Sequence, residues 1–507
     1  MKNYVLIIIL SVLFISSIGT GLAQPVKIDA EADNVEVFQQ SLEQDGFIVQ
    51  EGEVGFFDLI RLYNEGLIPS AYGNNPTTRY MAYFVPPAPG YEVNEKGSQV
   101  AKLLGKSGNA TAYYNLRPDE AVVFVGRTPP ECRYFNFDAN LMFRTYGNES
   151  RWIWANLGDP LNNAVIKTQG TLNGKAGSPF NQTTIIITTA DKNTDQRIRA
   201  AARSAGYSDG LINTQVLPST RLNMGLENNS DTFSIYIRPA LFKDKEAGDI
   251  YINNTPATIL RITPKENTGV TELDPYDVQE QRVRGTGKTE FNLTDDLEEL
   301  REAILKKYNT SNPTELPTSM WIPDGNDGMQ RGINIYGPNN DACYLWTANQ
   351  TVSSPTPPFN NILQSYEFTR NPGITLGNDS NEFIIVYGVN HVATGKATYT
   401  NFALYGADAW NGVGAITDMD INGTAEEYLP ENPNAKYLYV YKIARNCDDP
   451  DCYEVPYGRG AYGIDLDQKL FIAFRIYHEN ATKTGPSYSE IVYDRAIKFD
   501  PKNEGKQ

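Results

Sequence analysis

Residues 470–477 read LFIAFRIY, and this stretch decides the class of fold. It is rich in aromatic and β-branched residues, which is typical of a β-strand. FIIVY at 383–387 and YLYVYKI at 437–443 have the same character. Clusters of glycine, proline and asparagine lie between such runs, as turns lie between strands. The second half of the chain is therefore predicted to be built from sheets.

The first half shows the same pattern with a few helices added. Its predicted strands are AVVFV (121–125), TIIIT (184–188) and FSIYI (233–237). Helices are predicted at FFDLIRLYNEGL near the start, at RIRAAARSAG ending at Gly206, and from about Asp295, where Glu298 suggests a capping pair. The predicted class is mainly β to α+β, with two antiparallel, sandwich-like β modules and a few peripheral helices.

The N-terminal residues predict export. MKNYVLIIILSVLFISSIGTGLAQ combines Lys2, an apolar run and small residues before Gln24, which is the pattern of a cleaved secretory signal peptide. No later run is long enough to span a membrane. The polar segment from Pro264 to Phe291 suggests a division into a signal peptide (1–23), an N-terminal module (24–270) and a C-terminal module (271–507).

Asparagine acceptors for N-linked glycans are frequent. Eleven N-x-S/T sites without an intervening proline occur in the chain, a density that favours a secreted glycoprotein whose acceptors lie on the surface. They are Asn109, Asn148, Asn181, Asn228, Asn253, Asn292, Asn309, Asn349, Asn378, Asn422 and Asn480.

Charge and cysteine content fit this setting. The net charge of −17 argues against binding nucleic acid through a basic face. In an oxidising compartment, four cysteines suggest two disulfides. The short loop NCDDPDC makes Cys447 with Cys452 the expected local pair and leaves Cys132 with Cys343 as a long-range pair.

Signals for catalysis are few. The chain has two histidines and lacks H-E-x-x-H, C-x-x-C and G-x-S-x-G, which lowers the case for a multi-histidine metal enzyme or an α/β-hydrolase. His391 and Lys396 follow a predicted strand end, where catalytic groups gather, and they are the candidate catalytic pair. A hydrogen-bonded structural histidine is the alternative.

GTGKT at 285–289 ends like a phosphate loop but lacks the required first glycine, so a polar turn is expected.

The stretch TDMDINGTAEEY (417–428) has two competing interpretations. Its oxygen-bearing side chains around the turn at Gly423 form a candidate calcium site, although the twelfth position of a full EF-hand loop is Leu429 and not glutamate. A glycan on Asn422 would exclude that residue as a ligand. The candidate ligands are Asp418, Asp420, Asn422, Thr424, Glu426 and Glu427.

Two stretches resemble a domain of secreted bacterial proteins of unknown function. In NATAYYNLRPDEAVVFVGRTPPECRYFNFDANLMF (109–143) the strand and Pro-containing turn precede R-Y-F, and PNNDACY (338–344) resembles the N-x-D-T-x-Y segment of that domain. The resemblance covers about a tenth of the chain and implies a β-rich fold without an assigned activity.

These observations predict a secreted, glycosylated extracellular or cell-envelope protein with a structural or binding role, steadied by calcium and disulfides. Its many tyrosines and tryptophans beside polar loops make carbohydrate a candidate partner. The alternative is a secreted hydrolase or carbohydrate-active enzyme with a site between the modules. A pair of facing carboxylates in that site would favour the enzyme.

Overall fold

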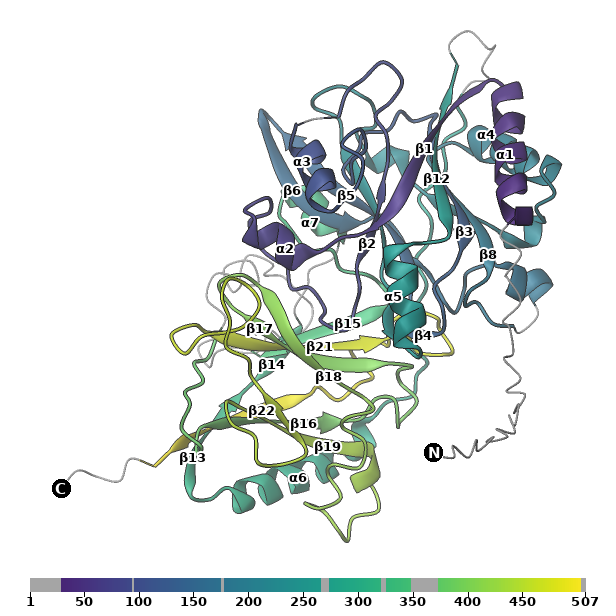
Figure 1. Ribbon diagram of the computed structural model, residues 1–507. Coiled ribbons are helices and arrows are strands. Elements are labelled where there is room, and N and C mark those ends of the chain that lie inside the picture. The colour runs from purple at the N-terminus through teal and green to yellow at the C-terminus, as the bar shows by residue number, and fades with distance from the viewer. Residues whose placement is uncertain are drawn as a thin grey trace, which may run out of the picture.

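The computed structural model describes residues 29–93, 95–174, 177–265, 273–320, 325–347 and 373–502 of the chain. They form two β-rich modules, one built on a single large sheet and the other on two smaller sheets (Figure 1). The predicted class, mainly β to α+β with a few peripheral helices, is confirmed. The predicted signal peptide and the acceptor Asn349 lie outside the described residues.

The N-terminal module contains a ten-stranded sheet in the order β6-β5-β10-β2-β1-β12-β3-β8-β9, with β7 paired to β5. Its pairs are antiparallel except β8 with β9. A separate short pair joins β4 (Cys132–Tyr134) to β11 (Ala240–Phe242). The strands of the large sheet are β1 (Phe47–Phe56), β2 (Met81–Phe84), β3 (Ala121–Arg127), β5 (Asn136–Tyr146), β6 (Glu149–Asn156), β7 (Leu161–Asn162), β8 (Thr183–Thr189), β9 (Ile212–Val216), β10 (Thr232–Ile237) and β12 (Ala257–Pro264).

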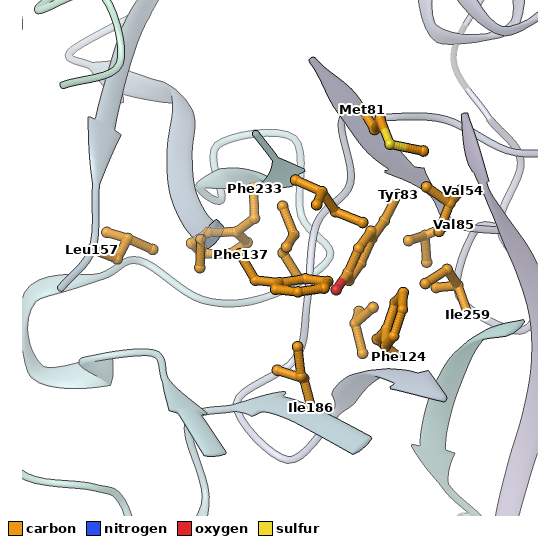
Figure 2. Close-up of a cluster of buried hydrophobic side chains, with 14 of the residues drawn as sticks. Val54, Met81, Tyr83, Val85, Phe124, Phe137, Leu157, Ile186, Phe233 and Ile259 are labelled. Carbon is orange, nitrogen blue, oxygen red and sulfur yellow. The ribbon is translucent and has the colours of Figure 1, made fainter. Parts of the chain in front are cut away.

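Residues 121–125 of strand β3 are apolar because both faces of the strand are covered there. Val123 and Val125 pack with α1 (Asp29–Gln44) and α4 (Lys192–Ser204), which lie along one side of the sheet (Figure 1). Val122 and Phe124 point the other way, into a core shared with side chains of β5, β6 and β10. Figure 2 shows Tyr83, Phe124 and Phe137 meeting there. The sheet therefore curls around its own apolar core.

The C-terminal module is a two-sheet sandwich. One sheet has the order β13-β22-β16-β19-β20 and the other β14-β15-β21-β17-β18. All pairs are antiparallel except β19 with β20. The strands are β13 (Ser311–Leu316), β14 (Thr318–Met320), β15 (Ala342–Thr347), β16 (Phe383–Val389), β17 (Thr400–Gly406), β18 (Asn411–Thr417), β19 (Leu438–Ala444), β20 (Cys452–Glu454), β21 (Leu470–Tyr477) and β22 (Arg495–Pro501).

Strand β21, the LFIAFRIY stretch, is the centre of its sheet. Ile472 and Phe474 point into the sandwich core, while Phe471 and Ala473 point out toward the N-terminal module. In the other sheet, β16 is likewise buried on both faces, because α6 (Thr294–Lys307) covers its outer side. Both strands are therefore apolar over most of their length, with Arg475 of β21 as the charged exception.

The three predicted helices are present, with one local difference. Helix α4 is capped by the Asp191 side chain, which accepts a hydrogen bond from the Thr194 amide, and its end is followed by Gly206 at φ 89°. Helix α6 begins at Thr294 without a side-chain cap, so the predicted pair of Asp295 and Glu298 is not formed. The predicted helix near the start of the chain is α2 (Leu59–Asn64). The structure adds the helices α3 (Glu95–Leu103), α5 (Lys245–Asn253) and α7 (Gly325–Arg331).

The modules meet through an aromatic interface. Tyr134 of β4 and Ala240 of β11 belong to one buried cluster with Tyr344 of β15 and Phe471 of β21. Figure 1 shows β4 beside β15 and β21. The last strand of the first module ends at Pro264 and the first helix of the second begins at Thr294. The predicted boundary between 270 and 271 lies outside the described residues.

Candidate functional site

A cleft of about 610 Å³ lies where the modules meet. It is lined by the end of β6, by residues 278–284 of the connecting segment, by the loop 338–340 and by the start of β15. Polar side chains supply most of its wall, and they come from both halves of the sequence. They include Asn156, Arg221, Gln279, Glu280, Gln281, Arg284, Asn339, Asn340, Tyr344 and Tyr488.

A short segment of the second half builds one wall by packing on the first module. The Ile335 amide donates to the Ile153 carbonyl at 3.0 Å, and the Gly337 amide donates to the Trp154 carbonyl at 2.9 Å. Ile335 is fully buried in the N-terminal core. A Cβ on Gly337 would come within 2.4 Å of the Trp154 ring, so a glycine is needed there. This attachment carries Pro338, Asn339 and Asn340 to the cleft.

Asp341, directly after these residues, turns away from the cleft into the interface. Its carboxylate accepts hydrogen bonds from the Tyr134 hydroxyl at 2.8 Å, the Asn162 amide at 2.7 Å and the Arg282 guanidinium at 3.1 Å. Burial raises the pKa of Asp341 to about 6, although Arg282 opposes the rise. The R-Y-F and PNNDACY stretches, which carry the bacterial resemblance, thus meet at the Tyr134–Asp341 hydrogen bond.

A second buried acid lies on β5. Asp138 approaches the Arg238 guanidinium at 3.0 Å without the alignment of a hydrogen bond. Burial raises the pKa of Asp138 to about 7, and Arg238 limits the rise. Neither Asp138 nor Asp341 lines the cleft, and among the described lining residues Glu280 is the one acid.

His391 is held between two carboxylates inside the sandwich. Its Nδ1 lies 2.9 Å from Glu290 Oε2, and its Nε2 lies 3.5 Å from Asp494 Oδ2. All three side chains are at most 5% exposed. Burial alone would lower the pKa of His391, but the two acids outweigh it and raise the pKa to about 10. A histidine charged at neutral pH cannot accept a proton, so this geometry fits a structural ion cluster better than a general base.

Lys396, the other candidate catalytic residue, forms a separate cluster. Its Nζ lies 2.6 Å from Glu490 and 3.2 Å from Glu479. The amides of Thr286 and Gly287 also donate to Glu490, at 3.0 and 2.6 Å. The amides of the GTGKT turn therefore bind a carboxylate of the protein itself. His391 and Asp494 line one small pocket, and Lys396 is not among the residues that line it.

Three carboxylates among the six candidate calcium ligands have other partners. Asp418 forms an ion pair with Arg133 across the module interface, and Asp420 accepts from the amide and hydroxyl of Thr417 at 2.8 and 2.7 Å. Glu427 pairs with Lys307 at 2.7 Å. The described residues contain no group of three or more His, Cys, Asp or Glu placed to hold a metal ion.

Calcium binding by this stretch stays a prediction. A calcium-dependent rise in melting temperature that Asp420→Ala abolishes would support it, and such a site would have to open the pairs just described.

The cysteines follow one of the two predicted pairings. Cys447 and Cys452 form a disulfide in the structure. Cys132 and Cys343 are free thiols, so the predicted long-range pair is not formed. The physical reason is that the two thiols lie in different apolar cores, one in each module, where each donates to a nearby carbonyl oxygen.

The glycan acceptors share one property. All ten acceptor asparagines within the described residues are exposed. Ten other asparagines are buried, among them Asn136, Asn162 and Asn411, and none of these is an acceptor. By contrast, Trp154 and Trp410, from two of the aromatic runs that suggested sugar stacking, are buried at the interface.

No helix in the described part of the chain is long and apolar enough to cross a membrane. The cleft was not predicted, because its walls join segments that lie far apart in the sequence. The paired asparagines at 339–340 were the available signal, and nothing in the sequence placed them in one cleft with Arg221.

Comparisons with known proteins give weak likenesses. No protein family matches the chain, and no curated protein matches it. Among solved structures, the VPA0106 protein from Vibrio parahaemolyticus is similar at 10% identity and a TM-score of 0.35, over 93% of this chain and 97% of that one. A putative uncharacterized protein from Burkholderia cenocepacia gives 10% identity and a TM-score of 0.36, over 92% and 87%. Both come from bacteria.

Proposed function

We propose that the chain is an exported, N-glycosylated binding protein that holds a carbohydrate in the cleft between its modules. The observation that carries this proposal is the 610 Å³ cleft itself, with a wall of amides, guanidinium groups and tyrosine rings. Side-chain amides both donate and accept hydrogen bonds, as sugar hydroxyls do, and aromatic rings pack against sugar faces. Pockets between domains are common ligand sites.

Export and glycosylation are supported by two independent features. The N-terminal stretch has the form of a signal peptide, and every described acceptor asparagine is exposed while the buried asparagines lie outside acceptor sites. N-terminal sequencing of the secreted protein should begin at Gln24. Release of N-glycans should lower its mass, and an unchanged mass would contradict glycosylation.

The test of binding uses an exposed residue of the cleft. Gln281→Ala removes one amide from the wall without disturbing a core, and Gln40→Ala on α1 is the matched control away from the cleft. A glycan array followed by calorimetry should find a ligand whose affinity falls about tenfold in Gln281→Ala, as expected for one lost polar contact, and stays constant in Gln40→Ala. Equal affinity in both variants would place the ligand elsewhere.

The secreted hydrolase is the second candidate. Glycoside hydrolysis uses two carboxyl groups on opposite sides of the scissile bond, and the described lining of the cleft provides Glu280 alone. Turnover of a bound glycan that is lost in Glu280→Gln would favour the hydrolase over the binding protein.

A further inference from the structure

A second, smaller cavity lies beside the cleft and is lined by residues of both modules. Its volume is about 20 Å³, and Tyr344 lines both spaces. The cavity wall combines two arginines, one from each module, with tyrosines and a tryptophan, and contains no aspartate or glutamate among the described residues. The polar and aromatic lining comprises Tyr72, Asn74, Thr78, Tyr80, Trp154, Arg238, Tyr336, Tyr344, Arg475 and Tyr477.

Several hydrogen-bond donors in this wall have no acceptor. The Tyr72 hydroxyl, the Trp154 indole Nε1 and the Arg238 Nε are buried and make no hydrogen bond to the described part of the protein, whereas the Arg238 Nη2 lies 3.0 Å from Asp138 Oδ2. Their residues are 5%, 3% and 6% exposed. Buried donors are normally satisfied, because an unmade hydrogen bond costs about 1 to 3 kcal/mol. Their gathering around one cavity indicates an occupant that accepts hydrogen bonds.

Arg475 adds a second positive charge. Its Nη2 donates to the Gly73 carbonyl at 2.7 Å, and its guanidinium lies over the rings of Tyr344 and Tyr405. The Arg238 Nη1 donates to the Gly337 carbonyl at 2.9 Å. The Gly73 and Gly337 carbonyl oxygens therefore each accept a hydrogen bond from one of the two arginines.

The backbone around the cavity is strained. Tyr72, Trp154 and Tyr336 have φ values of 54°, 36° and 60°, in the left-handed region that bulky residues avoid. The Tyr72 ring contacts the rings of both Trp154 and Tyr336, and Tyr336 stacks on Trp410, which has φ 54°. Such strain persists where surrounding structure fixes it, and it clusters at ligand sites.

We propose that this cavity binds a monatomic inorganic anion, chloride being the one that extracellular fluid supplies. A water molecule needs about 10 to 15 Å³ of such space, so the cavity has room for one occupant slightly larger than water and none for a sugar. An anion accepts from every free donor and compensates part of the buried charge of Arg238 and Arg475. Asp138 lies next to Arg238 but outside the lining.

The anion would connect the modules, because Tyr72, Trp154 and Arg238 belong to the first module and Arg475 to the second. The site is independent of the carbohydrate proposal. Its loss would weaken the interface without removing the cleft, and a protein that binds no glycan could still bind chloride here.

The test measures thermal unfolding in chloride against gluconate at a constant ionic strength of about 0.15 M. Above the dissociation constant, a tenfold rise in chloride should increase the ratio of folded to unfolded protein about tenfold, whereas gluconate should have no such effect. Equal stability in both salts would overturn the proposal.

Tyr72→Phe and Tyr83→Phe form a matched pair of variants. Each removes one buried hydroxyl that has no partner, but Tyr83 lies in the apolar core shown in Figure 2 and not at the cavity. Tyr72→Phe should weaken chloride affinity about tenfold or more, since it removes a hydrogen bond to a charged group, and Tyr83→Phe should leave it unchanged. An equal chloride effect in both variants would refute the assignment to this cavity.

Crystals grown in bromide provide a direct reading. An anomalous peak between Arg238 and Arg475 is expected. A water molecule at that position in bromide-grown crystals would overturn the proposal even if the two variants unfold at different temperatures.

Discussion

Replacing His391 with glutamine should destabilise the protein strongly at neutral pH. The substitution removes the positive charge between Glu290 and Asp494, whose side chains are 2% and 5% exposed, and leaves two buried carboxylates facing each other. Removing one partner of a buried ion pair typically costs about 3 to 5 kcal/mol. We expect a loss of this size in the free energy of unfolding at pH 7.

The pH dependence gives a sharper test than the size of the loss. The pKa of His391 is raised from 6.5 to about 10 in the folded state. Its contribution to stability is therefore fully present below pH 6.5 and is lost as the pH rises toward 10. A shift of this size corresponds to about 5 kcal/mol at most. The wild-type protein should lose stability across this interval, and His391→Gln should lose much less.

His478 is a natural control, because the chain has two histidines. Burial lowers the pKa of His478 to about 4, so it stays neutral from pH 6.5 to 10. His478→Gln should keep the wild-type slope in denaturant unfolding curves recorded at several pH values. Carbon-13 labelled histidine should show one ring titrating near pH 10 and the other near pH 4. A His391 ring that titrates near 6.5 would refute the ion-cluster reasoning.

Three further predictions concern the interface and the disulfide. Stability should fall as the pH rises from about 4 to 6, since burial raises the folded-state pKa of Asp341 to about 6, and Asp341→Asn should reduce that fall in unfolding curves. Tyr134→Phe should cost about 1 to 3 kcal/mol in denaturant unfolding, because it removes the hydroxyl that donates to the buried Asp341 carboxylate; an unchanged midpoint would contradict this role. Cys447→Ser should cost about 2 kcal/mol, the closure entropy of a short loop, and a reducing agent should have the same effect on the wild type but none on the variant.

The local elements were largely predictable. Stretches such as AVVFV and LFIAFRIY form strands because β-branched and aromatic side chains fit a sheet buried on both faces. Helix α4 begins at its aspartate cap and ends before a glycine, both of which are local signals. The start of α6 was predicted one residue late with a capping pair that does not form, because burial of Leu297 and Leu300 fixes this helix without it.

The candidate sites were less predictable. His391 and Lys396 are close in sequence, yet each enters its own cluster of acids contributed by residues about a hundred positions away. Asp418 was grouped with its neighbours as a calcium ligand, but its carboxylate pairs with Arg133 of the other module. A ligand motif specifies the spacing of residues along the chain, whereas the partners of a side chain are the groups that lie close to it in the folded structure.

The sequence by itself determined that this is a β-rich protein of two modules. The reason is that the spacing of apolar residues and the positions of turn residues direct the backbone conformation of their own short segments. Only the tertiary structure decided where polar groups from distant segments meet. The cleft, the Tyr134–Asp341 contact and the cavity between Arg238 and Arg475 all join residues separated by a hundred or more positions. Such contacts form when two sheet faces pack together. No local sequence pattern indicates which residues this packing brings into contact.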